Sequence, residues 1–222
     1  MEDPAFDWSS LIGEDLLLCK SALKEETKEQ KGITHLDDKL CSIRTSQALP
    51  KSLKLVLLYF SGRWCPVCTE FDNIMRDVYT ALQSFPEHSD IEFVWISCDL
   101  SEDSYKAHLK RLGVLSGATW SPKRLQEAAA RWDLKALPSL LVMDALDGRV
   151  VTANARRDVE DAYDDEQHGA NKGYLGLLLR WLELLDEQRA ALDDGLPMRS
   201  ESGIQGDTAG QSAGKGESSE FA

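Results

Sequence analysis

The residues best suited to chemistry in this chain of 222 residues are Cys65 and Cys68, which form the C-x-x-C motif Cys65-Pro66-Val67-Cys68. The apolar run 53–60 predicts a strand buried on both faces, and apolar residues at helical spacing follow the motif. Cys65 is therefore expected near a helix N-terminus, where the helix dipole and unpaired backbone N–H groups favour its thiolate. Such a thiolate would form a mixed disulfide with a substrate, and Cys68, one turn along, would displace it. Pro66 suits the first helical turn and stiffens it.

A structural zinc site and a pair of ordinary thiols are the alternative interpretations of the motif. Zinc needs four ligands, but the sequence has no second C-x-x-C and no H-x(3–5)-H. The four histidines are scattered: His35, His88, His108 and His168. The strand before the motif and the helix after it favour redox chemistry. Of the remaining cysteines, Cys98 is interpreted as a buried small apolar residue, and Cys19 and Cys41 as residues outside the chemistry.

The net charge, the first eight residues, the longest apolar run and the number of cysteines exclude several classes of binding partner and location. The 25 Lys and Arg against 38 Asp and Glu give a net charge of −13, which argues against general binding to nucleic acid or to anionic membranes. The acidic start, residues 1–8, resembles neither a secretory signal nor a mitochondrial presequence. The apolar run 55–60 is about a third of a membrane helix. With only five cysteines, we expect a protein of the reducing cytoplasm.

Elements of opposite hydrophobic period alternate between residues 16 and 189, which indicates an α/β sheet layered with helices. The strands expected after 53–60 are 91–98 and an antiparallel hairpin of 140–143 with 150–152. The helices expected are one after the cysteines, 102–112, one that begins at Ser121-Pro122, and a closing helix over 174–185.

Composition divides the chain into three parts. Residues 1–50 form an N-terminal extension with a first strand and a polar insertion around 24–32. Residues 51–190 form the main domain. Residues 195–222 are rich in Gly, Ser, Gln and acidic residues, and we expect a disordered acidic tail because so few apolar side chains cannot offset the ordering entropy.

A family resemblance is carried by Tyr59-Phe60-Ser61-Gly62-Arg63-Trp64-Cys65-Pro66-Val67-Cys68. This segment resembles the active-site segment Y-F-S-A-x-W-C-P-P-C of tryparedoxins and nucleoredoxins, which are members of the thioredoxin superfamily. Residues 11–17, the loop Leu137-Pro138-Ser139-Leu140 and residues 147–158 are also similar to that family. The resemblance implies a thioredoxin-like fold, a central mixed sheet flanked by helices on both faces, with a cis proline at Pro138 opposite the C-x-x-C.

The function that the resemblance implies is that of a thiol–disulfide oxidoreductase. Cys65 would be the nucleophile and Cys68 the resolving thiol, while Trp64, Pro66, Leu137 and Pro138 would shape substrate docking. No metal and no bound organic cofactor would be needed. The electron donor would be a low-molecular-weight dithiol of the trypanothione kind or a reductase, and the acceptors would be peroxidases or other disulfide-containing proteins.

Several positions depart from the family pattern. Val67 stands in place of the second proline, and Thr69 in place of an arginine, which removes a positive charge close to the sulfurs. Position 59, where thioredoxin itself carries a buried acid that assists proton transfer, is Tyr59, so Asp99 becomes a candidate assistant. Val67 and Thr69, together with the N-terminal extension and the acidic tail, support an alternative: a thioredoxin-fold interaction or assembly module with weak turnover or none.

Overall fold

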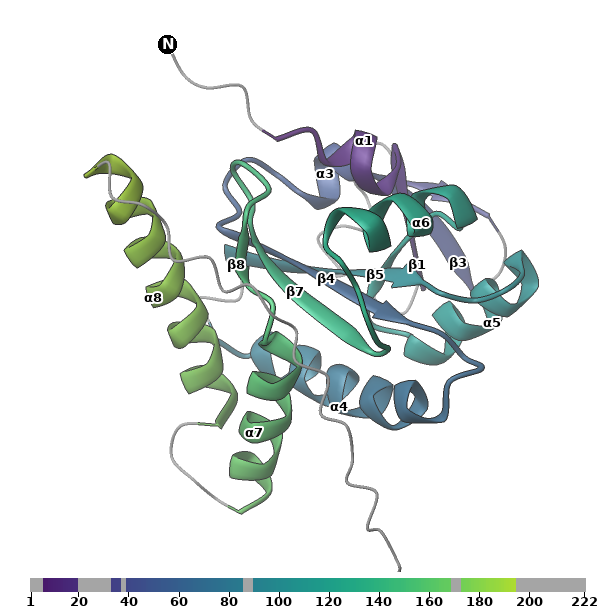
Figure 1. Ribbon diagram of the computed structural model, residues 1–222. Coiled ribbons are helices and arrows are strands. Elements are labelled where there is room, and N and C mark those ends of the chain that lie inside the picture. Colours follow the sequence, from purple (N-terminus) through teal and green to yellow (C-terminus); the bar gives the residue numbers. More distant parts are fainter. Residues whose placement is uncertain (1–5, 20–32, 37–38, 86–89, 169–172, 195–222) are drawn as a thin grey trace, which may run out of the picture.

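The computed structural model describes residues 6–19, 33–36, 39–85, 90–168 and 173–194 (Figure 1). The polar insertion around 24–32 and the acidic tail 195–222 lie outside the described residues. The described strands form one eight-stranded sheet in the order β2-β3-β1-β6-β5-β4-β7-β8. They are β1 (Asp15–Cys19), β2 (Thr34–His35), β3 (Leu40–Arg44), β4 (Leu55–Ser61), β5 (Ile91–Ser97), β6 (Ser116–Ala118), β7 (Ser139–Asp144) and β8 (Val150–Thr152).

The sheet is mixed, because its central strand β4 has a parallel neighbour on one side and an antiparallel neighbour on the other. Tyr59 of β4 lies opposite Trp95 of β5 in the parallel pair and opposite Leu140 of β7 in the antiparallel pair. β7 and β8 form the antiparallel hairpin expected from the sequence. At the other side, β1 joins β3 to β6 through two antiparallel pairings. The N-terminal strands therefore extend the same sheet that carries the C-x-x-C.

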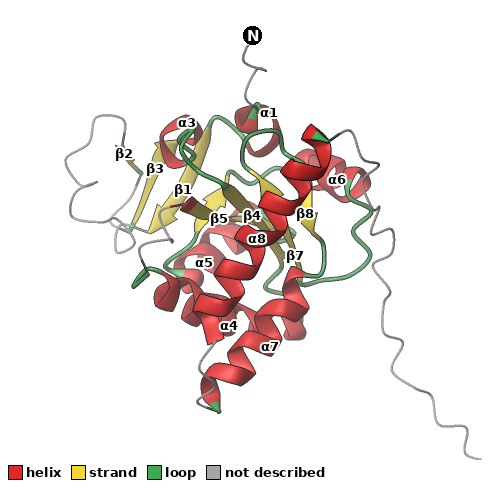
Figure 2. Cartoon of the chain, turned by 90° about the vertical axis from the view of Figure 1, so that its left-hand side faces the viewer, coloured by secondary structure: helices red, strands yellow, loops and turns green. Residues whose placement is uncertain are grey.

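Helices cover both faces of the sheet, as Figures 1 and 2 show. Side chains of α4, α5, α7 and α8 pack in one hydrophobic cluster, and those of α1, α3 and α6 pack in a second cluster on the opposite face. Their bounds are α1 (Trp8–Ile12), α3 (Thr45–Ala48), α4 (Pro66–Leu82), α5 (Glu102–Leu112), α6 (Pro122–Arg131), α7 (Ala155–Gln167) and α8 (Gly173–Asp193). This arrangement confirms the α/β architecture with a mixed sheet between helices.

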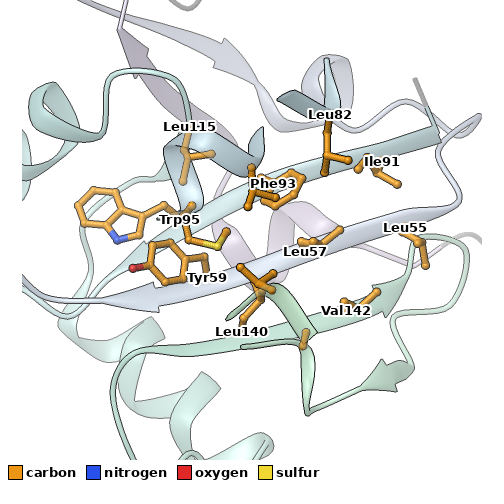
Figure 3. Packing of buried hydrophobic residues seen from close by; sticks show 14 of the residues in the cluster. Leu55, Leu57, Tyr59, Leu82, Ile91, Phe93, Trp95, Leu115, Leu140 and Val142 are labelled. Carbon is orange, nitrogen blue, oxygen red and sulfur yellow. The ribbon is translucent and has the colours of Figure 1, made fainter. Parts of the chain in front are cut away.

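Strand β4 supplies side chains to both hydrophobic clusters. All seven of its residues are buried, and alternate side chains face opposite ways because the strand period is two. Leu55, Leu57 and Tyr59 point into the cluster that α4 and α8 cover, where Figure 3 shows them along β4 next to Ile91, Phe93 and Trp95 of β5. The alternate residues of β4 belong to the other cluster. The expectation of a strand buried on both faces is thus confirmed, with the strand beginning at Leu55 and continuing through Ser61.

Helices α5 and α6 begin where the sequence predicted, and each has a serine side chain that caps its N-terminus. The Ser101 side chain accepts a hydrogen bond from the Ser104 N–H at the start of α5, and Ser121 accepts from Arg124 N–H at the start of α6. Helix α7 was not expected. Its sequence is strongly charged, and its buried stripe consists of the small residues Ala155, Val159 and Ala162, which give a weak periodic signal.

In the part of the chain that the structure describes, each helix is either too short or too polar to cross a membrane.

Trp181 is expected to be a main anchor of α8 on the sheet. Its side chain is fully buried, and its indole N–H donates to Asp158 of α7 at 3.2 Å. Replacing Trp181 with Ala should lower the free energy of unfolding by about 3–5 kcal/mol, because a large cavity forms. Urea unfolding measures the change. Leu179→Ala, on the same helix but 41% exposed, is the control and should cost no more than about 0.5 kcal/mol. Equal losses for the two variants would contradict this packing.

Candidate redox site at the N-terminus of α4

The two cysteines lie at the junction between the central strand and the helix that follows it. β4 ends at Ser61, and a short turn leads to Cys65, whose N–H donates to the Gly62 carbonyl at 3.0 Å. Cys65 is the N-cap residue of α4, and Pro66 takes the first helical position, where no backbone N–H is needed. The sequence-based placement of both residues at a helix start is confirmed.

The two sulfur atoms have different surroundings. The Cys65 Sγ accepts a hydrogen bond from the Cys68 N–H at 3.3 Å, in the manner of an N-cap side chain. Such donation by a backbone N–H at a helix N-terminus stabilises a thiolate. Cys68 is fully buried, and burial, followed by its hydrogen bond with Cys65, raises the pKa of the Cys68 thiol to about 12. The arrangement therefore suits attack by Cys65 and storage of a proton on Cys68.

An exposed aromatic ring adjoins the first cysteine. The Trp64 side chain is 57% exposed, and its indole N–H donates to the Cys98 carbonyl at 2.8 Å. Gly62 makes this position possible, because a Cβ there would lie 2.7 Å from the Trp64 Nε1 and 3.2 Å from the Cys98 carbonyl oxygen. Val67 and Leu100 are also exposed. Trp64 is thus positioned by one hydrogen bond and offers an accessible apolar surface.

The residues expected from the proline loop lie at the same edge of the sheet as the end of β4. Phe60 is paired with Ser139, so Pro138, which precedes Ser139, lies near the point where the chain leaves β4 for the cysteines. The Leu137–Pro138 peptide bond is cis, as the resemblance implies. Pro138 is buried and Leu137 half-buried. The structure brings the start of β7 and the start of α4 to one edge, and the docking roles of Leu137, Pro138, Trp64 and Pro66 stay predictions.

Asp72, a buried acid near the cysteines, is a residue of this site that was not predicted from the sequence. Asp72 lies four residues after Cys68 on α4, so both point to the buried face of the helix. Its Oδ1 accepts from the Tyr59 hydroxyl at 2.6 Å and from the Ser61 hydroxyl at 3.0 Å. Burial and then the charge of Asp72 raise the pKa of Tyr59 well above its usual range, so the phenol stays a donor. An aspartate on the apolar face of a helix was the signal available in the sequence.

His108 of α5 bridges two buried carboxylates. Its Nε2 lies 2.9 Å from Asp72 Oδ2, its Nδ1 lies 2.9 Å from Asp99 Oδ2, and Arg111 also pairs with Asp72. A carboxylate oxygen only accepts, so a proton on each ring nitrogen, the imidazolium form, satisfies both carboxylates. Burial opposes this charge, but the hydrogen bonds with Asp72 and then Asp99 outweigh burial and raise the pKa of His108. The imidazolium charge contributes its full stabilisation of the fold at pH values below the usual histidine pKa. This contribution is lost as the pH rises through the raised pKa of His108.

Asp99 connects this buried group to the turn before Cys65. Its Oδ1 accepts from the Arg63 N–H at 2.8 Å, and its Oδ2 accepts from the Ser97 hydroxyl at 2.9 Å as well as from His108. Burial would raise the pKa of Asp99, but the hydrogen bonds with His108 and Arg63 lower it. Asp99, expected as a candidate proton-transfer assistant, therefore has both carboxylate oxygens engaged.

No three His, Cys, Asp or Glu side chains among the described residues are arranged to hold a metal ion.

Comparison with known proteins agrees with this geometry. Residues 52–150 match the family model described as thioredoxin-like. The chain is 29% identical over 104 residues to probable nucleoredoxin 3 of Oryza sativa subsp. japonica, an alignment that covers 47% of this chain and 21% of the relative. It is 27% identical over 109 residues to tryparedoxin of Trypanosoma brucei brucei, covering 49% of this chain and 74% of the relative.

Solved structures show the same fold. Native tryparedoxin I from Crithidia fasciculata superposes with a TM-score of 0.50 at 24% identity, over 63% of this chain and 91% of the other. Tryparedoxin from Trypanosoma brucei gives a TM-score of 0.50 at 20% identity, over 67% and 86% of the two chains. At these identities the likeness concerns the fold.

The match over residues 52–150 and these superpositions show that the protein has a thioredoxin-like fold. In sequence it is similar, at low identity, to nucleoredoxins and to a tryparedoxin. It spans less than a third of the length of the nucleoredoxins that it matches, such as bovine nucleoredoxin, of which the alignment covers 30%.

The burial of Cys68 and Cys98 predicts slow chemical labelling of both thiols. Burial, with the neighbouring Asp99 as the next cause, also raises the pKa of Cys98 to about 12. At pH 8 we expect iodoacetamide to label Cys68 and Cys98 at least about a hundredfold more slowly in the folded chain than in the urea-unfolded chain. Peptide mass spectrometry gives the rates, with Cys65 as the internal reference expected to label first. Equal labelling rates for Cys65 and Cys68 would contradict the different surroundings of the two sulfur atoms.

Proposed function

We propose that this protein is a thiol–disulfide oxidoreductase that reduces disulfides through Cys65 and Cys68. One observation carries the proposal: the Cys65 Sγ lies at the N-terminus of α4 and accepts a hydrogen bond from the Cys68 N–H, while the Cys68 thiol is buried one turn away. A nucleophilic sulfur at the helix N-terminus and a resolving sulfur one turn further along the helix are the two parts that disulfide exchange requires. The thioredoxin-like match, within which both residues fall, supports this reading.

The reaction balances within the two sulfurs. The Cys65 thiolate attacks one sulfur of the substrate disulfide, the S–S bond breaks, and the first substrate sulfur leaves as a thiolate. Cys68 then loses its proton, and its Sγ attacks the Cys65 Sγ, which releases the second substrate sulfur as a thiolate. Two protons convert the released thiolates to thiols. The protein ends with a Cys65–Cys68 disulfide, and the substrate has gained two electrons.

The surroundings of the sulfurs support a polypeptide or peptide disulfide as the substrate. Trp64 offers an exposed apolar ring, Pro66 and exposed Val67 follow at the helix start, and Leu137-Pro138 lies at the same sheet edge. The two electrons pass from the sulfur atoms of Cys65 and Cys68 to those of the substrate, so the exchange needs no metal and no organic cofactor. We assign reduction of the Cys65–Cys68 disulfide to a low-molecular-weight dithiol or a reductase, and assign peroxidases or other disulfide proteins as the acceptors.

Trapping of the mixed disulfide tests the function. With oxidised glutathione as the probe, Cys68→Ser should accumulate a stable glutathione adduct on Cys65, because the resolving thiol is missing. The wild-type chain should instead end with a Cys65–Cys68 disulfide, and Cys65→Ser should form no adduct at the motif. Intact-mass and peptide mass spectrometry after acid quenching distinguish these species. Cys98→Ala is the matched control and should behave as the wild type.

A folded Cys68→Ser variant that forms no adduct on Cys65 would overturn the proposal. Since the fold would then be present without exchange chemistry, that result would favour the interaction or assembly module instead.

A further inference from the structure

A group of four charged side chains, three of them buried and one half-buried, lies between the cysteine helix and α5. We call it the ion cluster: Asp72, Asp99, His108 and Arg111. We infer that His108 is a positioning residue for the dithiol, because its imidazolium ties together the two segments that frame the C-x-x-C and its charge favours the Cys65 thiolate. This inference rests on the proposed function, whose reacting atoms are the same sulfurs.

The hydrogen bonds of His108 reach both sides of the motif. Through Nε2 it bonds to Asp72, one helical turn after Cys68 on α4. Through Nδ1 it bonds to Asp99, which in turn accepts the backbone N–H of Arg63, two residues before Cys65. The ring therefore connects the turn that enters the motif with the helix that leaves it. A movement of either segment would break a hydrogen bond to a buried charge, which costs more than a neutral one.

Trp64 depends on the same segment. Its indole N–H bonds to the carbonyl of Cys98, the residue directly before Asp99, and the Trp120 indole N–H bonds to the Asp99 carbonyl at 3.1 Å. Asp99 is thus held in place by two contacts: His108 binds its side chain, and Trp120 binds its backbone carbonyl. The segment Cys98–Asp99 supports the exposed ring beside the nucleophile, and His108 holds that segment from within the core.

The charges of the ion cluster balance only while His108 is protonated. Two carboxylates face one imidazolium and one guanidinium, so the sum is zero. The His108 side chain is fully buried, whereas that of Arg111 is 35% exposed and is screened by solvent. Removing the imidazolium charge leaves a net negative charge under the cysteines, and a negative charge disfavours a nearby thiolate. The charge of His108 therefore acts on the reactive sulfur as well as on the geometry.

The groups that face His108 come from three elements. Asp72 lies on α4, Asp99 follows β5, and Arg111 is on α5 with its guanidinium 3.1 Å from the ring Nε2. The Tyr59 hydroxyl of β4 bonds to Asp72, and the Trp95 ring of β5 packs on the imidazole at a centroid distance of 4.6 Å. Two carboxylates outweigh one guanidinium, so the charged ring persists to higher pH than usual, in agreement with the raised pKa of His108.

The substitution His108→Gln tests the positioning role, because glutamine has a similar length and no charge. We expect the rate of Cys65 alkylation by iodoacetamide at pH 7 to fall about three- to tenfold, and its pH profile to move upward by on the order of half to one pH unit. In equilibrium with glutathione, the variant should favour the Cys65–Cys68 disulfide several-fold more than the wild type. His168→Gln, at the exposed end of α7, is the matched control and should change neither readout.

A measurement on the unmodified chain keeps the inference testable if His108→Gln does not fold. By linkage, a ring that favours the thiolate must itself hold its proton more tightly when the thiolate is present. The NMR titration of His108 should therefore give a higher pKa in the dithiol state than in the disulfide state. Equal values, or a folded His108→Gln variant with the wild-type alkylation profile, would overturn the inference. Alkylation of Cys65 requires no disulfide exchange. If the chain fails to exchange with glutathione but His108→Gln still shifts the pH profile of Cys65 alkylation as expected, the result counts against the proposed function and not against the role of His108.

Discussion

The position of the dithiol depends on the burial of β4. Every residue of this strand is buried, and it is paired along its length with β5 on one side and β7 on the other. Any shift of β4 would break two hydrogen-bonded ladders and disturb both hydrophobic clusters, and a shift by one residue would exchange the faces of all its side chains. The turn from Gly62 to Cys65 therefore starts from a fixed point, and Pro66 fixes the first turn of α4. The two sulfurs lie on a rigid junction rather than on a flexible loop.

The buried charges beside this junction are paired closely enough to be tolerated. An unpaired carboxylate in the core would cost several kcal/mol, but Asp72 accepts hydrogen bonds from four side chains, including His108 and Arg111. These donors come from β4 and α5, so Asp72 joins both elements to α4 beside the cysteines.

The sequence predicted the elements that have local causes. The C-x-x-C at a helix start, the helix over 102–112, the N-cap Ser121, and the hairpin of β7 and β8 each follow from residues within a few positions of one another. The ion cluster has no such local signature, because His108 is 36 residues from Asp72 and its partners meet only when α4 and α5 pack on one face of the sheet. In the sequence, His108 is therefore one of four scattered histidines with no visible partner. Position 59 gave the nearest hint: a tyrosine where a thioredoxin carries an acid requires a buried partner for its hydroxyl, and Asp72 is that partner.

The residues of the proposed chemistry lie within the segment that matches the thioredoxin-like model, and α8, outside that segment, packs against the same hydrophobic core. Both cysteines, Pro138 and the ion cluster all fall within residues 52–150. Outside it, α8 contributes Trp181 to the cluster that contains Tyr59, and Arg189 of α8 forms two hydrogen bonds, at 2.8 and 2.6 Å, with buried Asp144. Asp144 ends β7, whereas Pro138 precedes its start, so α8 is fastened at the edge of the sheet opposite the cysteines. The helix can stabilise the central strands without covering the edge at which Trp64 is exposed.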